Sequence, residues 1–446
     1  MLTLRRLLEF CWLIVDQAVF ALSNFAMNVL FARWLKPTDY GLFAVSFTGY
    51  LFLTVIHWGA FLEPLLVLSA QISADRRRSY VVTLGLVHVL MILAAMIISG
   101  AVFALCSHLG SPDTGWAVVG AGIGGSMMLM LITARRLCLV FLSPRISATV
   151  GVAYCIGVLG SGSLLVEYDL SWFNLWELMG FWSLLCSGLI FLLLYLRTEG
   201  TEPYPLRRLF AFQSQYAPGA IVASICNWAS FDGVYLILAH MLGLTAVAQT
   251  RAVFTLANPL VHVNQAMHAS WLVMFSEQAR EGQKPPIWRI AGLYGAAIGG
   301  LVFILFCTAR PLVNVVYGGR YLEAAWQLPL FVTVIGLTGI AAMITSLFKS
   351  RGSLLQGFLP QVVSAAVALS VAVWLIKSHG QAGAIYALIS GSLSALLTAS
   401  LTLLFFGPKD ATRPRDINER QQEKRPSTRF SRRVVRLYAT SRRSGS

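Results

Sequence analysis

The chain has 446 residues, of which 57% are hydrophobic and only 12% are charged, and its formal net charge is +15. Soluble proteins carry about twice that share of charged residues, so the composition excludes a soluble domain. Apolar runs of about 20 residues, the length that crosses a bilayer as a helix, recur along nearly the whole chain.

These runs predict an all-α integral membrane protein with about twelve transmembrane helices. The first run follows Arg5 and Arg6, as in a signal peptide, but Asp16 interrupts it and no small-residue cleavage site follows. It is therefore interpreted as a retained first span. In chain order the predicted spans are 8–32, 40–68, 80–106, 116–134, 147–166, 174–196, 211–241, 244–276, 290–309, 323–347, 355–377 and 382–407.

The distribution of positive charge predicts the orientation of these spans. With a cytoplasmic N-terminus, 28 of the 34 Lys and Arg residues fall in cytoplasmic segments, Arg135 and Arg136 among them. Only five fall in outer segments, and Arg251 alone lies inside a span. Because cytoplasmic loops of membrane proteins carry an excess of Lys and Arg, we expect both termini on the cytoplasmic side.

Spans and charges together predict four parts. They are an N-terminal six-helix bundle (1–200), a cytoplasmic linker (201–209), a C-terminal six-helix bundle (210–407) and a cytoplasmic tail (408–446). The tail carries 12 basic and 4 acidic residues and has the composition of a disordered segment. It is interpreted either as a solvated tail or as a clamp on the lipid surface. Positive charge is the tail's only feature that would favour nucleic-acid binding. Because no other feature supports it, no nucleic-acid partner is expected.

An internal repeat supports the two-bundle arrangement. A shift of 207 positions lays the first hairpin over the start of the seventh and eighth spans. Ala32 then meets Ala239, Leu35 meets Leu242, Thr38 meets Thr245, Phe47 meets Phe254, and Gly41 meets Ala248. Both hairpins join spans of the same direction, so the sequence predicts two parallel halves related by an axis along the membrane normal.

Three segments resemble the Wzx-type polysaccharide flippases, which belong to the multidrug/oligosaccharidyl-lipid/polysaccharide exporter superfamily. The first is the corner Ala32-Arg33-Trp34-Leu35 with Pro37-Thr38-Asp39-Tyr40-Gly41-Leu42-Phe43. The others are Pro311-Leu312-Val313 through Tyr317-Gly318-Gly319-Arg320-Tyr321, and Gly380-Gln381-Ala382-Gly383-Ala384. The chain departs from the family at Ala248-Gln249, where a Gly-Tyr pair is usual. The resemblance covers most of residues 10–407.

The resemblance implies a transporter, not an enzyme, with no cofactor and with two pseudo-symmetric bundles around a central cavity. It implies translocation of polyprenyl-pyrophosphate-linked oligosaccharide across the bacterial inner membrane, for surface polysaccharide such as lipopolysaccharide or exopolysaccharide. The implied partners are membrane lipids, the lipid-linked oligosaccharide, and polysaccharide polymerase and export machinery. The alternatives are a multidrug/organic-cation antiporter of the related branch, a major-facilitator transporter, and a membrane polymerase or ligase.

Polar residues inside the spans are the candidate binding groups, because they are costly there and face a cavity or a partner helix. Gln17, Asn24 and Asn28 form one stripe on the first helix. Arg251, Asn258 and His262 lie on a second stripe, on the eighth helix. The two stripes are interpreted as the walls of a hydrated substrate cavity, or else as side chains bonded between helices.

Arg251 is the principal candidate, because a guanidinium can grip the oxygens of a phosphate group. The alternative is a structural ion pair with Asp232 on the preceding helix. Asp232 and Asp16 are the candidates for carrying a coupling ion; Asp16 is interpreted as a solitary acid. His57, His88 and His262 show no metal-binding spacing, and we expect them to be hydrogen-bonded core residues. Glu63-Pro64 is interpreted as a kink or helix end.

Overall fold

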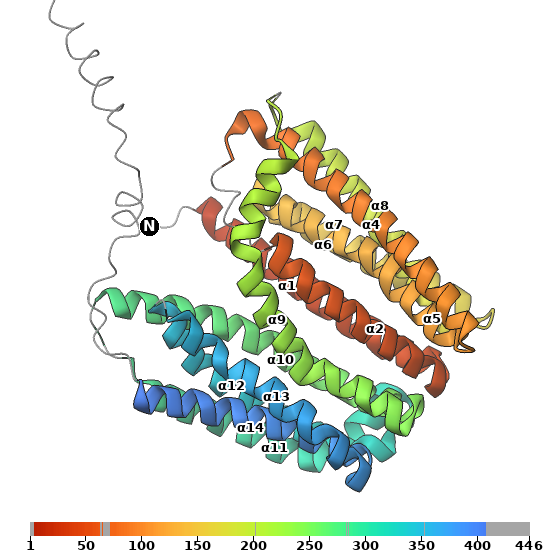
Figure 1. Ribbon diagram of the computed structural model, residues 1–446, viewed down its shortest axis with the longest axis vertical. Coiled ribbons are helices and arrows are strands. Elements are labelled where there is room, and N and C mark those ends of the chain that lie inside the picture. The colour runs from red at the N-terminus through yellow and green to blue at the C-terminus, as the bar shows by residue number, and fades with distance from the viewer. Residues whose placement is uncertain are drawn as a thin grey trace, which may run out of the picture. The chain divides into compact units, whose positions relative to one another are not determined.

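The computed structural model describes residues 4–62, 65, 72–200, 202–281, 283, 285–351 and 353–406. Every regular element in these residues is a helix (Figure 1). The expected helix end at Glu63-Pro64 and the basic tail lie outside the described residues.

The first half of the chain contains six membrane-length helical segments, two of which include a π-helical turn. Its elements are α1 (Leu4–Trp34), α2 (Pro37–His57) with the π-helix η1 (Trp58–Leu62), η2 (Ala74–Arg76), α4 (Arg77–His108), α5 (Pro112–Val119), η3 (Gly120–Gly124), α6 (Gly125–Phe141), α7 (Pro144–Val166) and α8 (Trp172–Arg197). α5, η3 and α6 follow one another directly and form one span.

The second half repeats this number of segments. Its elements are α9 (Leu206–Leu242), α10 (Leu244–Arg280), α11 (Ile287–Tyr317), η4 (Leu322–Ala324), α12 (Gln327–Ser350), α13 (Leu354–His379) and α14 (Gln381–Phe405). Among the described residues, 11 helical segments are long and apolar enough to cross a membrane. α10 is the remaining long helix. Its polar stripe explains why its composition alone does not identify it as a membrane-spanning helix. The predicted all-α membrane fold is confirmed.

One predicted boundary was wrong, and the error changes the place of a charge. The fourth span was expected to end at residue 134, with Arg135 in a cytoplasmic segment. α6 continues to Phe141, and Arg135 is only 8% exposed within it. The helix continues because Leu137 and Cys138, one turn further on, are also buried, so the apolar packing does not stop at the two arginines.

Two apolar cores each lie mainly in one half. The first lies mainly in α1 to α8, where it includes Phe31, Phe43 and Trp176, and it extends into α10 at Ala248. The second lies mainly in α9 to α14, where it includes Phe254 and Phe331, and it extends into α2. The predicted repeat is in register, because a shift of 207 lays Pro37, the first residue of α2, over Leu244, the first residue of α10.

The predicted linker is docked on the first half. The Arg78 guanidinium donates through Nε to the Thr198 carbonyl at 2.9 Å, and the Tyr204 N–H donates to the Ser79 hydroxyl at 2.7 Å. Gly200 has a φ of +118°, and a Cβ there would lie 2.2 Å from the Asp75 carbonyl oxygen. The segment after α8 is thus held against the start of α4, and α9 already begins at Leu206.

The two corners of the repeat also touch each other. A Cβ added to Gly41, near the start of α2, would lie 2.3 Å from the carbonyl oxygen of Leu244, at the start of α10. Backbone cannot move as cheaply as a flexible side chain, so this approach requires glycine at position 41.

We predict that Gly41→Ala lowers the melting temperature of the purified protein in detergent, at a cost of about 1–3 kcal/mol for the overpacked contact. Gly100→Ala on α4 is the matched control, because no atom lies within 4 Å of its added Cβ. The control should melt at the wild-type temperature or slightly above it, since alanine favours helix by about 0.5–1 kcal/mol. Equal melting temperatures for the two variants would contradict the close corner contact.

Candidate functional site

The halves meet along α1 and α2 on one side and α9 and α10 on the other, and α10 packs on both α1 and α2 (Figure 1). We call the end of the molecule that holds the α1–α2 and α9–α10 turns the corner end. Toward this end the facing helices are buried, as at Phe31 of α1 and Val247 of α10, and so is Leu35, just after α1. Toward the other end they are exposed, as at Gln17 and Gln265. On α1 and α10, burial is therefore concentrated at the corner end, while α2 and η1 also pack along α9 away from that end.

Two arginines join the halves at the corner end. Arg33, in the last turn of α1, donates through Nη2 to the Val315 carbonyl at 2.7 Å and through Nε to the Val316 carbonyl, both in the last turn of α11. Arg320, just after α11, donates through Nη1 to the carbonyls of Arg33 at 2.7 Å and Leu35 at 2.9 Å. The last carbonyls of a helix have no partner within the helix, and they attract positive charge. Each half therefore caps a helix end of the other half.

Tyrosines complete this contact. The Tyr321 hydroxyl donates to the Ala32 carbonyl at 3.1 Å, and its ring lies 6.2 Å from that of Tyr40. The Tyr317 hydroxyl donates to the Ala252 carbonyl of α10 at 2.7 Å. The apolar core of the first half accordingly extends across the corner end to include both tyrosines.

Arg251 and Asp232 form an ion pair beside this contact. Arg251 is 6% exposed, and its Nη1 donates to Asp232 Oδ1 at 3.2 Å. The guanidinium carbon also lies over three rings, at 5.3 Å from Tyr235, 5.5 Å from Phe254 and 5.7 Å from Phe47. Phe47 belongs to α2, so Arg251 touches both halves. The ion pair that was the alternative to substrate binding is thus present, and it uses one of the five N–H donors of the guanidinium.

The structure places the remaining predicted substrate-binding residues on two helices that pack together, α1 and α10. Asn28 is 8% exposed and donates to the Asn24 carbonyl of its own helix at 2.9 Å, while Gln17 is exposed. Asn258 and His262 are half-buried. The stripe on α10 thus runs from the buried Arg251 toward the exposed end of the helix. A cavity wall formed by both stripes stays a prediction.

Asp16 is not solitary, contrary to the sequence interpretation. It is 1% exposed, and its Oδ1 accepts from Arg135 Nη2 at 2.6 Å and from the Ser147 hydroxyl at 2.7 Å. Gln17 Nε2 donates to Asp16 Oδ2 at 2.9 Å. Arg135 was missed because it was assigned to a loop, although its place at the end of an apolar run was a visible signal. A coupling proton on Asp16 or Asp232 would first have to displace an arginine.

His57 and His88 are core residues, as expected, and they contact each other. Their Nε2 atoms lie 2.9 Å apart, and Thr133 Oγ1 lies 3.2 Å from the first and 2.9 Å from the second. The three residues come from α2, α4 and α6. In the part of the chain that the structure describes, no group of three His, Cys, Asp or Glu side chains is arranged to hold a metal ion.

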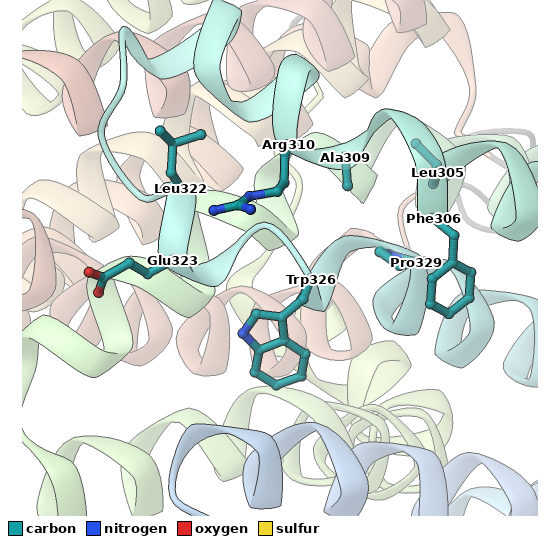
Figure 2. A pocket seen from close by; sticks show the side chains of 8 residues that line it. All are labelled: Leu305, Phe306, Ala309, Arg310, Leu322, Glu323, Trp326 and Pro329. Atoms are coloured by element: carbon teal, nitrogen blue, oxygen red, sulfur yellow. The ribbon is translucent and has the colours of Figure 1, made fainter.

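A groove of about 330 Å³ lies on the second half alone, between α11 and the segment from η4 to α12 (Figure 2). Arg310 and Glu323 are the charged residues that line it, together with apolar side chains such as Phe306 and Trp326. It contains none of the residues predicted to bind substrate. The candidate site is therefore the Arg251 region between the halves, not this groove.

No protein-family model and no curated protein matches the chain. Solved structures do match. The lipid II flippase MurJ, in an inward closed conformation, gives a TM-score of 0.65 at 12% identity over 89% of this chain and 87% of MurJ. An inward-facing multidrug resistance MATE family transporter of the MOP superfamily gives 0.66 at 13% identity over 89% of this chain and 97% of its own. The chain has the fold of the MOP-superfamily transporters.

An outward-facing MATE structure gives a lower TM-score of 0.58, at 12% identity over 88% of this chain and 93% of its own. The expected resemblance to the Wzx branch is narrower than the MOP fold, and it stays a prediction.

We predict that Arg320→Ala loosens the corner end. The probe is a cysteine that replaces Leu35, which is 1% exposed, in a protein without the native cysteines. This cysteine should be alkylated about tenfold faster when Arg320 is replaced by alanine than when Arg320 is present. The variant loses two charge-assisted hydrogen bonds, each of which contributes about 1.5–3 kcal/mol when buried. Their contribution is smaller here because the site is partly exposed to solvent. Arg310→Ala, which removes an exposed arginine of α11, is the control and should leave the rate unchanged. The same rate in both variants would show that the arginine caps do not hold the corner end closed.

Proposed function

We propose that the chain is a flippase that moves polyprenyl-pyrophosphate-linked oligosaccharide from the inner to the outer leaflet of a bacterial inner membrane by alternating access. It would serve the synthesis of surface polysaccharide, lipopolysaccharide or exopolysaccharide. Its partners would be membrane lipids, the lipid-linked oligosaccharide, and the polymerase and export machinery that act on the flipped product.

The observation that carries the proposal is the environment of Arg251. It is a buried cation at the junction of the halves, and in the described structure it makes one side-chain hydrogen bond, to Asp232. A pyrophosphate offers several acceptor oxygens to a planar guanidinium, which binds them in pairs. Asn258 and His262 extend from Arg251 toward the exposed end of α10, where hydroxyl groups of a saccharide could be hydrogen-bonded.

The direction of transport rests on the distribution of positive charge. The corner end holds Arg33, Lys36 and Arg320, which belong to the sparse positive charge of the outer segments. The exposed end of α1 and α10 is then cytoplasmic. In this proposal the lipid-linked substrate enters from the cytoplasmic leaflet, at the end where α1 and α10 are exposed.

The alternative is an organic-cation antiporter, whose fold would be the same. A cation site in the membrane needs unpaired negative charge, and the two acids discussed above already lie beside an arginine, the buried Asp16 with Arg135 and the half-buried Asp232 with Arg251. The junction therefore suits an anion better than a cation.

The experiment is to deplete the protein in its host and to quantify polyprenyl-pyrophosphate-linked oligosaccharide on each membrane face. We expect the lipid-linked sugar to accumulate on the inner face while surface polysaccharide is lost. Unchanged lipid-linked sugar, together with new sensitivity to cationic drugs, would instead support the antiporter.

We predict that the double variant Arg251→Gln/Asp232→Asn reaches wild-type abundance but does not transport. It removes both charges together, whereas Arg251→Gln alone leaves a buried carboxylate unpaired and should cost about 3–5 kcal/mol of stability. The matched control is Asp16→Asn/Arg135→Gln, which neutralises the ion pair within the first half. We expect this control to retain transport, as measured by surface polysaccharide against immunoblotted protein. Normal polysaccharide in the first double variant would show that Arg251 is a structural residue and not a phosphate ligand.

A further inference from the structure

The buried histidine pair has a defined hydrogen-bond order. His88 Nδ1 lies 2.8 Å from the carbonyl of Leu84, which accepts hydrogen bonds only, so this nitrogen carries a proton. In a neutral ring His88 Nε2 is then an acceptor, and the 2.9 Å contact requires His57 Nε2 to be the donor. The neutral His57 ring therefore has an unprotonated Nδ1.

That nitrogen is a vacant acceptor inside the protein. His57 is 2% exposed and His88 is 1% exposed, and His57 Nδ1 has no hydrogen-bond partner among the described residues. The Phe61 ring covers both imidazoles, at 5.3 Å from His57 and 5.4 Å from His88. A buried nitrogen without a partner is rare, and it is the one place in this pair where a proton can add without breaking an existing bond.

The pair also lies next to a π-helix that packs on the other half. His57 is the last residue of α2, and the π-helix η1 follows it directly. η1 packs on α9, the first helix of the second half. Single π-helical turns within α-helices are frequent at functional sites. A change in the charge of His57 would therefore act at a contact between the halves.

The charged groups on the surrounding elements have other partners or lie elsewhere. On α6, Arg135 binds Asp16 and Arg136 lies over the Trp58 ring at 5.2 Å. On α4, Arg78 binds the Thr198 carbonyl, and on α9, Asp232 binds Arg251. On α2, α4, α8 and α9, the other acidic, basic and histidine side chains that the structure describes are Asp39, Arg77, His108, Glu177, Arg197, Arg207 and His240. The described contacts of the two rings are with each other, Thr133, Phe61 and the Leu84 carbonyl.

We propose that the His57–His88 pair is the proton-binding site that couples the transport cycle to a proton gradient. A hydronium ion transfers its proton to the lone pair of His57 Nδ1: one O–H bond breaks, an N–H bond forms and water leaves. The ring becomes an imidazolium, and His57 Nε2 continues to donate to His88 Nε2. This assignment rests on the proposed transport function and names its coupling ion.

Coupling follows because the two protonation states need different surroundings. A charged ring whose Nδ1–H has no acceptor is costly in a buried site. The proton therefore binds best in a conformation in which the η1–α9 contact opens and Nδ1 reaches water or a carbonyl. A ligand shifts a conformational equilibrium toward the state that it binds more tightly. Proton binding to His57 therefore favours the conformation in which the η1–α9 contact is open.

The test uses full-length protein in proteoliposomes with a fluorescent polyprenyl-pyrophosphate monosaccharide as the probe. We expect wild-type protein to move the probe about fivefold or more faster with a pH gradient than without one. His57→Gln keeps a donor amide toward His88 but cannot bind the proton, so its rate should not respond to the gradient. His268→Gln is the control, because His268 is a half-buried histidine of α10 bonded to Ser346, and it should respond as wild type does.

A second measurement tests the proton site without transport. At each pH between about 5 and 8, the range in which histidines titrate, amide hydrogen exchange of η1 is compared between wild type and His57→Gln. The ratio of the two rates cancels the chemical effect of pH. We expect this ratio to change about fivefold or more across the range. If His57→Gln yields too little protein, His57→Asn replaces it, since it also removes the nitrogen that binds the proton.

The outcomes separate the two proposals. A gradient response that survives in His57→Gln, or an exchange ratio that is constant with pH, overturns the histidine site and leaves the flippase proposal standing. No movement of the probe by wild-type protein under any gradient overturns the flippase proposal. In that case the exchange ratio still tests whether proton binding at His57 changes the conformation of η1.

Discussion

The arrangement of the two halves depends on carbonyl groups that helix ends leave without a partner. α1 and α11 both end at the corner end, and each would expose its last carbonyls to a site that is partly out of water. Arg33 caps α11 and Arg320 caps α1, so each half supplies what the other lacks. Both interactions would break if the halves separated at this end, so both stabilise the contact between the halves.

Buried charge follows a different pattern, because it is neutralised within each half. Asp16 and Arg135 pair inside the first half, and Asp232 and Arg251 pair inside the second. The halves can then move apart without leaving an unpaired charge in the membrane, a cost of several kcal/mol. Only Arg251 also touches the opposite half, through the Phe47 ring. A substrate phosphate that competes for Arg251 would therefore act on the contact between the halves.

Much of the fold could be predicted from the sequence, because apolar length, positive charge and an internal repeat are local properties of the chain. The repeat even gave the correct register of α2 and α10. Long-range partners could not be predicted in the same way. Asp16 and Arg135 are 119 positions apart, and no local pattern links them. The two segments around Arg33 and Arg320 resembled one family separately, and only the structure shows that they bind each other. For Arg251, phosphate binding and an ion pair were both predicted from the sequence, and the structure shows the ion pair with Asp232.

The central claim is that the halves alternate between closure at the corner end and closure at the opposite end. Two spin-label pairs in a background otherwise free of cysteine test it directly: Lys36→Cys with Glu323→Cys at the corner end, and Cys11 with Ser270→Cys at the opposite end, all exposed sites. In lipid bilayers with a polyprenyl-pyrophosphate saccharide, we expect a second, longer distance for the first pair and a second, shorter distance for the second pair. A single unchanged distance for both pairs, with and without the saccharide, would contradict alternating access.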